Sequence, residues 1–320
     1  MTPSDPPVPA VFFKAYYMIT SRCNLDCEYC VLEDKPHQLR GELDLSGKIS
    51  LIDHLYHRLR FRRLTLSGGE ALLIGKRPPD DFLVLVEHLR RLRSPDPARN
   101  LELGLYTNGS YLDERVADAL AGVFDVVALT LDSASEGLLR KIGRSTRAHP
   151  EYFRRAVEAC GRLSRRGIRL KLHTVVGQLN QASIADEGRA IYEAVLAAGG
   201  RPAKWKFYQY MSYDDPVRDL AHAIPDEVYG RATDAIARAL EGTGVSLHFK
   251  DNSEMNASLF NILHYGNAQY MRPGDTWSTT RRTRDLREYG SMEELFTQHD
   301  IDQAAFRRHH AIVRTAGGGV

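Results

Sequence analysis

The sequence predicts an α/β protein built on a partial (βα)6 barrel, open rather than closed, with a C-terminal extension. Short apolar runs rich in β-branched and aromatic residues alternate with longer segments of helical period, at spacings typical of parallel β–α–β connections. Six such units are too few to close an eight-stranded barrel, so an open sheet is the expected geometry. Ligands then bind at the carboxyl ends of the strands.

Each expected barrel element follows from its local pattern. The strands are short runs of β-branched and aromatic residues, and the helices repeat their apolar residues at helical spacing. The expected strands cover residues 11–19, 63–67, 101–106, 126–131, 169–176 and 205–210, and the helices cover 45–60, 80–92, 112–121, 152–165 and 184–198. The polar motifs described below each lie at the end of one of these strands.

After Tyr210 the alternation stops, and an acidic, turn-prone run over 212–216 begins the extension. We expect a helix over 225–240, with Pro225 well placed at its start. A strand over 245–249, an extended segment over 258–263 and a helix over 292–299 follow, before a frayed Gly-rich end at Gly317. The expected organisation is a disordered leader (1–10), a barrel (11–211) and an extension that closes the substrate side (212–316).

The composition is that of a soluble globular protein, with 320 residues, 43% hydrophobic and 26% charged. The net charge of +2 gives no argument for a nucleic-acid or membrane surface, so any basic site must be local. The Pro-rich start lacks the features of a signal peptide, and no apolar run approaches the length of a membrane span. We therefore expect a cytoplasmic protein.

Three of the four cysteines are crowded into the run Cys23-Asn-Leu-Asp-Cys27-Glu-Tyr-Cys30. Three thiolates without a fourth partner nearby can hold three irons of a four-iron cluster and leave the fourth iron open to a ligand that is not protein. A zinc site completed by His37 is the alternative, although structural zinc sites favour a second cysteine pair, which is absent. The remaining Cys160 lies in an apolar helical pattern and is expected in the core.

With the aromatic Tyr29 just before the third cysteine, this run resembles the signature of radical S-adenosylmethionine (radical SAM) enzymes. The resemblance implies a [4Fe–4S] cluster on Cys23, Cys27 and Cys30, whose open iron is chelated by the amino and carboxylate groups of S-adenosylmethionine (AdoMet). One electron, from a donor such as flavodoxin or ferredoxin, then splits AdoMet into methionine and a 5′-deoxyadenosyl radical. That radical removes a hydrogen from the substrate.

Three further motifs resemble the AdoMet-binding positions of this family and add Gly68, Gly69, Glu70, Asn108, Ser133 and Arg144 to Tyr29 as expected cofactor contacts. Ser67-Gly68-Gly69-Glu70 is close to the family's GGE, with Ala71 where proline is usual, and is assigned to the methionine amino group. Thr107-Asn108-Gly109 resembles TNG. The third motif is the Ser133 hydroxyl after the fourth strand together with the Arg144 guanidinium, a pair that suits the AdoMet carboxylate. Taken alone, the glycine and Asn-Gly pairs are ordinary turns and Arg144 is a solvated charge.

Within this superfamily the chain resembles the viperin-like enzymes, which modify nucleotides. The similarity runs from about Phe13 to Arg308. It is carried by 170–180, which resembles LKINTVVN…LN, by 204–209, which resembles RWKVFQ, by 252–258, which resembles NEKMRNS, and by the spacing of a terminal helix pair over 292–306. Departures fall on the substrate side. His173 replaces an asparagine, Asn256 an arginine and Leu259 a tyrosine, and the usual aromatic terminus is missing.

Lysines near the strand ends predict a polyanionic substrate independently of any family. Lys171 and His173 share one face of their strand, as do Lys204 and Lys206. Inward lysines are costly unless they meet an anion, and a triphosphate satisfies several at once. Alternation alone leaves open that they point into solvent. The resemblance matches Arg63, Lys171, Lys204 and Lys206 to phosphate-binding positions.

Three functions remain open at this stage. The first is a viperin-like lyase that removes the C4′ hydrogen of CTP or UTP and forms a 3′-deoxy-3′,4′-didehydro nucleotide, which implies antiviral defence. The second is a radical SAM enzyme that acts on another nucleotide, a phosphorylated metabolite or a peptide, although the low cysteine count argues against peptide-maturing enzymes with additional clusters. The third is a non-catalytic iron–sulfur or zinc protein, for which the glycine, asparagine and arginine motifs would have no common purpose.

Overall fold

The computed structural model describes residues 10–30, 41–212, 215–256, 259–272, 275 and 279–314. Almost all of the expected leader lies outside these residues, as do His37 and Gly317. The side chain of Asn256, one of the substrate-side departures, is not described either.

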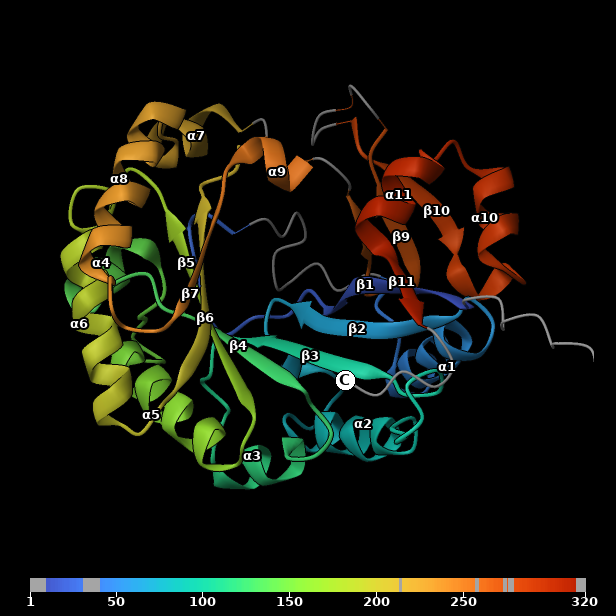
Figure 1. Cartoon of the computed structure of the whole chain (residues 1–320). Coiled ribbons are helices and arrows are strands. Elements are labelled where there is room, and N and C mark those ends of the chain that lie inside the picture. Colours follow the sequence, from blue (N-terminus) through green and yellow to red (C-terminus); the bar gives the residue numbers. More distant parts are fainter. Residues whose placement is uncertain are drawn as a thin grey trace, which may run out of the picture.

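One curved sheet is the scaffold of the described chain (Figure 1). Its parallel strands lie side by side in chain order: β1 (Ala10–Thr20), β2 (Phe61–Gly68), β3 (Glu102–Thr107), β4 (Val126–Thr130), β5 (Arg169–Val176), β6 (Pro202–Gln209) and β7 (Ser246–Lys250). Beyond β1 the sheet continues through β8 (Phe260–Ile262), β9 (Asn267–Tyr270) and β10 (Arg281–Asp285), while β11 (Ala311–Arg314) also pairs with β1. The described sheet therefore ends at β7 and β10, and the barrel is open, as the sequence predicts.

Helices cover the outer face of the parallel strands (Figure 1). In chain order, the helices of the described residues are α1 (Leu45–His57), α2 (Asp80–Arg90), α3 (Glu114–Leu120), α4 (Glu136–Ile142), α5 (Tyr152–Arg165), α6 (Ile184–Ala197), α7 (Pro216–His222), α8 (Asp226–Ala239), α9 (Asn252–Asn256), α10 (Met292–Gln298) and α11 (Gln303–His310). Of these, α7 lies beyond the carboxyl ends of the strands, where Arg218 donates to the carbonyl of Cys30. Two short 3₁₀ turns are η1 (Ala71–Leu73) and η3 (Leu286–Glu288). Alternate strand residues such as Leu64, Leu129, Leu172 and Phe207 are fully buried in the core. Because side chains alternate along a strand, their neighbours face the inside of the open barrel.

Two expectations are corrected by the fold. The alternation does not stop at Tyr210, because α8 leads into β7, which adds a seventh parallel strand beside β6. The first helix ends at His57 rather than at residue 60, since Arg60 turns with φ of 59° and β2 already begins at Phe61. The short helix α4 was not expected; it begins at the N-cap Ser135 and ends at Gly143.

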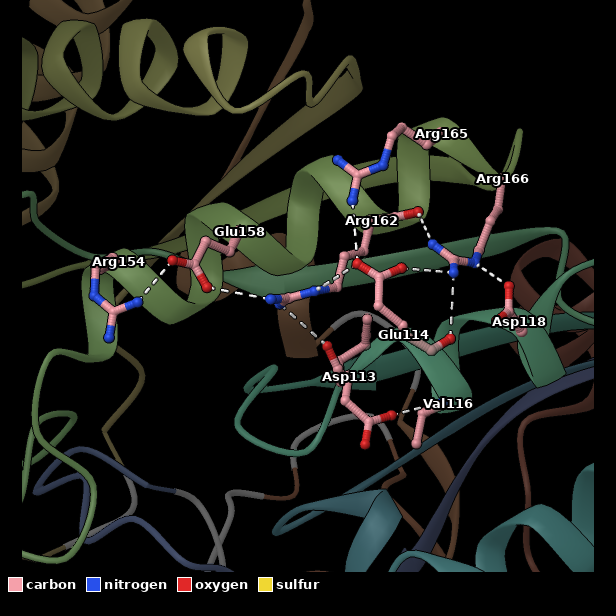
Figure 2. Close-up of polar contacts among 10 residues, drawn as sticks. Asp113, Glu114, Val116, Asp118, Arg154, Glu158, Arg162, Arg165 and Arg166 are labelled. Carbon is pink, nitrogen blue, oxygen red and sulfur yellow. Dashed lines mark hydrogen bonds and ion pairs between the residues drawn. The ribbon is translucent and has the colours of Figure 1, made fainter.

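A ladder of charged side chains joins α5 to α3 on the outer surface (Figure 2). Arg166 pairs with Glu114 and Asp118, each at 2.7 Å, and Arg162 bridges Glu114 and Glu158. Exposed pairs are individually weak, so this network contributes mainly as a set. Among the described helices, none has the length and apolar character needed to cross a bilayer.

Candidate active site

The cysteine loop, residues 21–30, follows β1 and packs against the end of α4. The amide of Asp26 donates to the carbonyl of Gly143 at 3.1 Å, and that of Glu28 donates to the carbonyl of Ile142 at 3.0 Å. Gly143 has φ of +83°, and a Cβ there would lie 1.9 Å from the carbonyl oxygen of Asp26 and 3.1 Å from the Cα of Cys27. Only glycine therefore permits this approach.

The Gly68-Gly69 turn at the end of β2 holds the other side of the loop. The amide of Gly69 donates to the carbonyl of Thr20 at 3.0 Å. A Cβ on Gly68 would lie 2.3 Å from that carbonyl oxygen, and a Cβ on Gly69 would lie 2.2 Å from the carbonyl oxygen of Arg22. The two glycines thus serve first to let β2 and the cysteine loop meet, and they leave their backbone groups at the pocket wall.

A pocket of about 330 Å³ lies above these turns, at the carboxyl ends of the strands. It collects the three cysteines, Tyr29, Gly68, Gly69, Asn108, Arg144 and His173 from the predicted set. The remaining predicted residues, Glu70, Ser133, Arg63, Lys171, Lys204 and Lys206, do not line it. Residues from the loop after β1 and from β2, β3 and β5 therefore meet at one site, as expected for a parallel sheet.

The thiols have the chemistry of cluster ligands. Burial raises the pKa of Cys23 to about 11 and that of Cys27 to about 12, so a bound metal must displace their protons. Within the described ranges, no three His, Cys, Asp or Glu side chains converge closely enough to hold a single metal ion. Three sulfurs spread around one pocket suit a multi-iron cluster, in which each sulfur binds a different iron, better than one zinc ion.

Glu70 has a positioning role beneath the pocket. Its buried carboxylate accepts hydrogen bonds from the hydroxyl of Thr107 at 2.8 Å, the amide of Asn108 at 2.7 Å and the amide of Leu72 at 3.2 Å. Asn108 in turn donates from Nδ2 to Oδ1 of Asn24 at 2.9 Å. Glu70 therefore connects the turn after β2 to the Thr107-Asn108-Gly109 turn and does not itself reach the pocket.

Arg144 is fixed by an aspartate that the sequence analysis did not single out. Asp132, fully buried at the end of β4, accepts from Nε of Arg144 at 2.6 Å, from the amide of Val175 at 2.8 Å and from the hydroxyl of Tyr29. Burial raises the pKa of Tyr29, so its hydroxyl stays protonated. The Arg144 charge is thus largely compensated, and its role at the pocket is that of an oriented hydrogen-bond donor.

Ser133 is engaged elsewhere. Its hydroxyl donates to the carboxylate of Glu187 at 2.9 Å and accepts from the amide of Ser135 at 2.8 Å. The structure therefore does not bring Ser133 and Arg144 together as a clamp. Adjacent residues at a strand end point in opposite directions, so Asp132 reaches Arg144 and Ser133 does not.

The predicted lysines form a row of cations on the inner face of β5 and β6. Lys171 lies opposite Lys204, and His173 lies opposite Lys206. Burial, and then the neighbouring lysines, lower the pKa of Lys206 to about 8. Burial, Lys204, Arg169 and Arg63 lower the pKa of Lys171. Since Trp205 and Phe207 are fully buried on the helix side, the alternating Lys204 and Lys206 of the same strand face inward.

In the described ranges, these lysines lack the acidic partners that a structural role would supply. Among the described residues, no carboxylate lies within ion-pair distance of Lys171, Lys204 or Lys206. Arg63 differs, because it pairs with Glu102 at 2.6 Å.

His173 lies where the row of cations meets the pocket. It is 6% exposed, and its Nε2 has no hydrogen-bond partner among the residues that the structure describes. The rings of Tyr106 and Tyr208 meet it edge-on, at 4.6 and 5.3 Å between centroids. Burial, Lys206 and Lys171 lower its pKa to about 3, so it is a neutral imidazole.

Several lining residues were missed by sequence reasoning. Tyr16, Tyr106 and Thr130 face the pocket from inward positions of β1, β3 and β4. The alternation of each strand could have found them, since each is two residues from another inward position. Asn261 from β8 had no comparable signal, because its strand is only three residues long.

Comparison with known proteins identifies the family. The model of the radical SAM superfamily matches residues 17–186. A GTP 3′,8-cyclase of Parasynechococcus marenigrum is 29% identical over 251 residues, which are 71% of this chain and 69% of the relative. An S-adenosylmethionine-dependent nucleotide dehydratase of Psychrobacter lutiphocae is 26% identical over 253 residues, covering 74% and 75% of the two chains.

Solved structures agree on the fold. The enzyme anSMEcpe with bound AdoMet and a peptide superposes with a TM-score of 0.64 at 17% identity, covering 92% of this chain and 83% of that one. SuiB of Streptococcus suis bound to S-adenosylmethionine gives 0.62 at 10% identity, covering 93% and 67%. Because the family model spans more than half of the sequence, the chain belongs to the radical SAM superfamily, whose members use a [4Fe–4S] cluster and AdoMet.

Proposed function

We propose that this radical SAM enzyme removes a hydrogen atom from a nucleoside triphosphate, with CTP or UTP as substrate and ribose C4′ as the position attacked. The observation that carries the proposal is the row of lysines on the inner sheet face next to the pocket, for which the described part of the chain offers no carboxylate partner. Two relatives support it independently, since one is named a GTP 3′,8-cyclase and the other a nucleotide dehydratase.

The row of cations is poorly stabilised without an anion. Lys171, Lys204 and Lys206 are half-buried on neighbouring strands, and their mutual repulsion contributes to the lowered pKa values of Lys171 and Lys206. A triphosphate brings several negative charges into this row and restores the protonated lysines through charge-assisted hydrogen bonds. A neutral or singly charged substrate would leave most of the repulsion in place.

The position of His173 supports one orientation of the nucleotide. This residue lines the pocket and also lies opposite Lys206 in the strand pairing. A ligand with its phosphates on the lysines therefore has its ribose beside the pocket that holds the three cysteines. Such closeness is what hydrogen-atom removal requires, because the reacting atoms must be held a few ångströms apart.

The proposed reaction balances as a dehydration that consumes one electron. The 5′-deoxyadenosyl radical takes the C4′ hydrogen atom, and the 3′-hydroxyl takes up a proton from solvent and leaves as water. A second electron, from an external one-electron reductant such as dithionite, completes the C3′–C4′ double bond. The cluster, when bound and reduced, supplies the electron that cleaves AdoMet. The chain's own residues bind the triphosphate and orient C4′.

GTP cyclisation is the second candidate, because the lysine row suits any nucleoside triphosphate and a GTP 3′,8-cyclase aligns over 71% of this chain. A peptide substrate is less well supported. Beyond the three clustered cysteines the sequence holds only Cys160, which is fully buried in α5, so no ligands exist for additional clusters.

The deciding experiment is an anaerobic assay of the reconstituted enzyme with AdoMet, dithionite and each of the four ribonucleoside triphosphates. We expect CTP or UTP to accelerate 5′-deoxyadenosine formation and to yield a nucleotide lighter by one water. With the substrate deuterated at C4′, the label should appear in 5′-deoxyadenosine. Acceleration by GTP alone, with a product of the same mass as GTP, would establish the cyclase instead. No response to any triphosphate contradicts a nucleotide substrate.

Lys206→Ala tests the lysine row directly. The variant should raise the KM for the nucleotide about tenfold or more, since it removes one charge-assisted contact, while AdoMet cleavage without nucleotide stays measurable. The exposed Lys76, which does not line the pocket, provides the matched control, Lys76→Ala, which should leave KM unchanged. An unchanged KM in Lys206→Ala would remove the main support for the proposal.

A further inference from the structure

The inner face of the sheet carries basic side chains on three neighbouring strands rather than two. In the pairing of β6 with β7, Lys206 lies opposite His248. Directly paired residues of a sheet point to the same side. The next residue of β7, Phe249, stacks on the buried Phe207 with 5.6 Å between ring centroids, so it faces the helices. Because side chains alternate, His248 faces the inside of the barrel, and β7 adds an imidazole to the row of lysines.

The charges that surround His248 are mainly positive. Burial lowers its pKa first, and the cations that lower the pKa further are Lys204, Lys206, Lys250 and Lys171. His248 is therefore mainly neutral at pH 7 while no anion is bound. Within the described ranges, the one carboxylate at ion-pair distance from any of these basic groups is that of Glu254, which lies 3.9 Å from Nζ of Lys250.

Ser246 suits both protonation states of His248. Its Oγ lies 3.0 Å from Nε2 of the imidazole, two residues along the same strand. A serine hydroxyl rotates, so it can donate to the neutral ring and accept from the protonated one. In the protonated ring both nitrogens donate, so Nδ1 can bind an anion while Nε2 keeps its contact with Ser246. His248 can therefore take up a proton without rearrangement of the strand.

The distance of β7 from the pocket determines which part of the nucleotide it meets. Counted from β1, the last parallel strand that lines the pocket is β5, through His173. Neighbouring strands lie about 4.8 Å apart, so β7 lies about 10 Å beyond β5, across β6. The inference rests on the proposed function, in which the ribose lies beside the pocket and the phosphates lie on the lysines. The phosphate chain then runs from β5 toward β7, and its last phosphate lies nearest His248.

We propose that His248 binds the terminal phosphate of the nucleotide and makes the enzyme select triphosphates over diphosphates. The two inner phosphates are held by Lys171, Lys204 and Lys206, and a diphosphate ends at these lysines without reaching β7. The negative charge of the third phosphate opposes the effect of the lysines on the imidazole. His248 therefore takes up one proton from solvent and forms a charge-assisted hydrogen bond with the phosphate.

Calorimetry of the anaerobic holoenzyme with AdoMet measures this contact, and reductant is left out so that no turnover occurs. CTP is compared with CDP, and GTP with GDP, because recognition of a phosphate does not depend on the base. The wild type should bind each triphosphate about tenfold or more tightly than its diphosphate. His248→Gln should raise the Kd for the triphosphates about tenfold and leave that for the diphosphates within about twofold. Unchanged binding of the diphosphates also shows that the variant is folded.

Proton uptake gives a second readout, obtained by calorimetry in two buffers with different ionisation enthalpies at pH 7. The wild type should take up more protons on binding CTP than His248→Gln does. The difference isolates His248, because Lys206 and the nucleotide contribute to both proteins alike. His248→Lys should restore the preference for triphosphates without the additional uptake, because a lysine is already protonated at this pH.

His57→Gln is the matched control. His57 is exposed in the last turn of α1, shortly before the amino end of β2, and its replacement should change neither the Kd values nor the proton uptake. Equal affinity of the wild type for triphosphate and diphosphate overturns the inference, as does an equal loss for both in His248→Gln or an unchanged Kd for the triphosphates. These results leave the proposed function standing. If neither triphosphate binds, the proposed function and this inference both fail.

Discussion

Gly143→Ala should disrupt the cysteine loop while leaving the barrel folded. The backbone of Gly143 has φ of +83°, a conformation that costs a residue with a Cβ about 1–2 kcal/mol. In addition, the new Cβ would lie 1.9 Å from the carbonyl oxygen of Asp26. Because such contacts do not fall below about 3 Å, the loop would have to retreat by roughly 1 Å.

A displacement of this size would move the cysteine ligands, because the Cα of Cys27 lies only 3.1 Å from the position of the new Cβ. Misplacement by about 1 Å in a positioned reaction can cost about a hundredfold in rate. We therefore expect Gly143→Ala to retain less iron after anaerobic reconstitution and to cleave AdoMet about a hundredfold more slowly. Iron per chain, the visible spectrum and 5′-deoxyadenosine formation measure these effects.

Gly167→Ala is the matched control. Gly167 has φ of +69°, but a Cβ there would meet nothing within 4 Å, so the variant carries the same backbone cost without the collision. Thermal unfolding should show that this backbone cost lowers stability by a similar amount in both variants, whereas iron content and AdoMet cleavage should fall only in Gly143→Ala. If Gly143→Ala binds iron and cleaves AdoMet as well as Gly167→Ala does, the contact does not position the ligands.

Three other predictions concern the groups around the site. The pKa of Lys206 is lowered to about 8, so without substrate its charge is lost above that pH. The KM for the nucleotide should therefore rise above pH 8 in the wild type. It should rise much less in Lys206→Arg, because arginine stays protonated. Glu70→Gln turns a donor toward the amide of Asn108, so it should lower the free energy of unfolding by about 1–3 kcal/mol. It should also weaken AdoMet binding, which equilibrium dialysis measures. Unchanged AdoMet binding would count against the positioning role of Glu70. Arg166 lowers the pKa of Glu114, so its stabilisation is present above the unfolded pKa of that carboxyl and is lost as pH falls through the folded value. Arg166 lowers the pKa of Asp118 in the same way, so Arg166→Ala should lower stability more at neutral pH than at acidic pH, without changing AdoMet cleavage.

The sequence alone predicted the strands and helices that bury long apolar segments. The expected strand over 169–176 coincides with β5, and the expected helix over 152–165 coincides with α5. The cysteine spacing was equally informative, because few sites use three thiolates without a fourth. By contrast, α4 and α7 are each seven residues long, too short for a clear helical period, and α7 turns its aliphatic residues outward.

The site shows a second limit, which comes from strand geometry. Ser133 was expected to bind AdoMet with Arg144, yet the neighbouring Asp132 is the residue that contacts Arg144. A shift of one residue at a strand end reverses the direction of the side chain. The residues of such a turn can be read from the sequence, but the direction of each side chain cannot. The carboxylate of Asp132 therefore occupies the position that was expected for the hydroxyl of Ser133.

The direction of the lysines, by contrast, follows from their neighbours. Trp205 and Phe207 are both fully buried against the helices, and Nε1 of Trp205 donates to the hydroxyl of Thr174 at 2.9 Å. Turning Lys204 and Lys206 outward would require these two aromatic side chains to face the polar interior of the barrel. Each would lose about 1.5–3 kcal/mol of burial, whereas inward lysines keep a route to solvent or to a bound anion. The packing that anchors β6 therefore also enforces the cationic inner face.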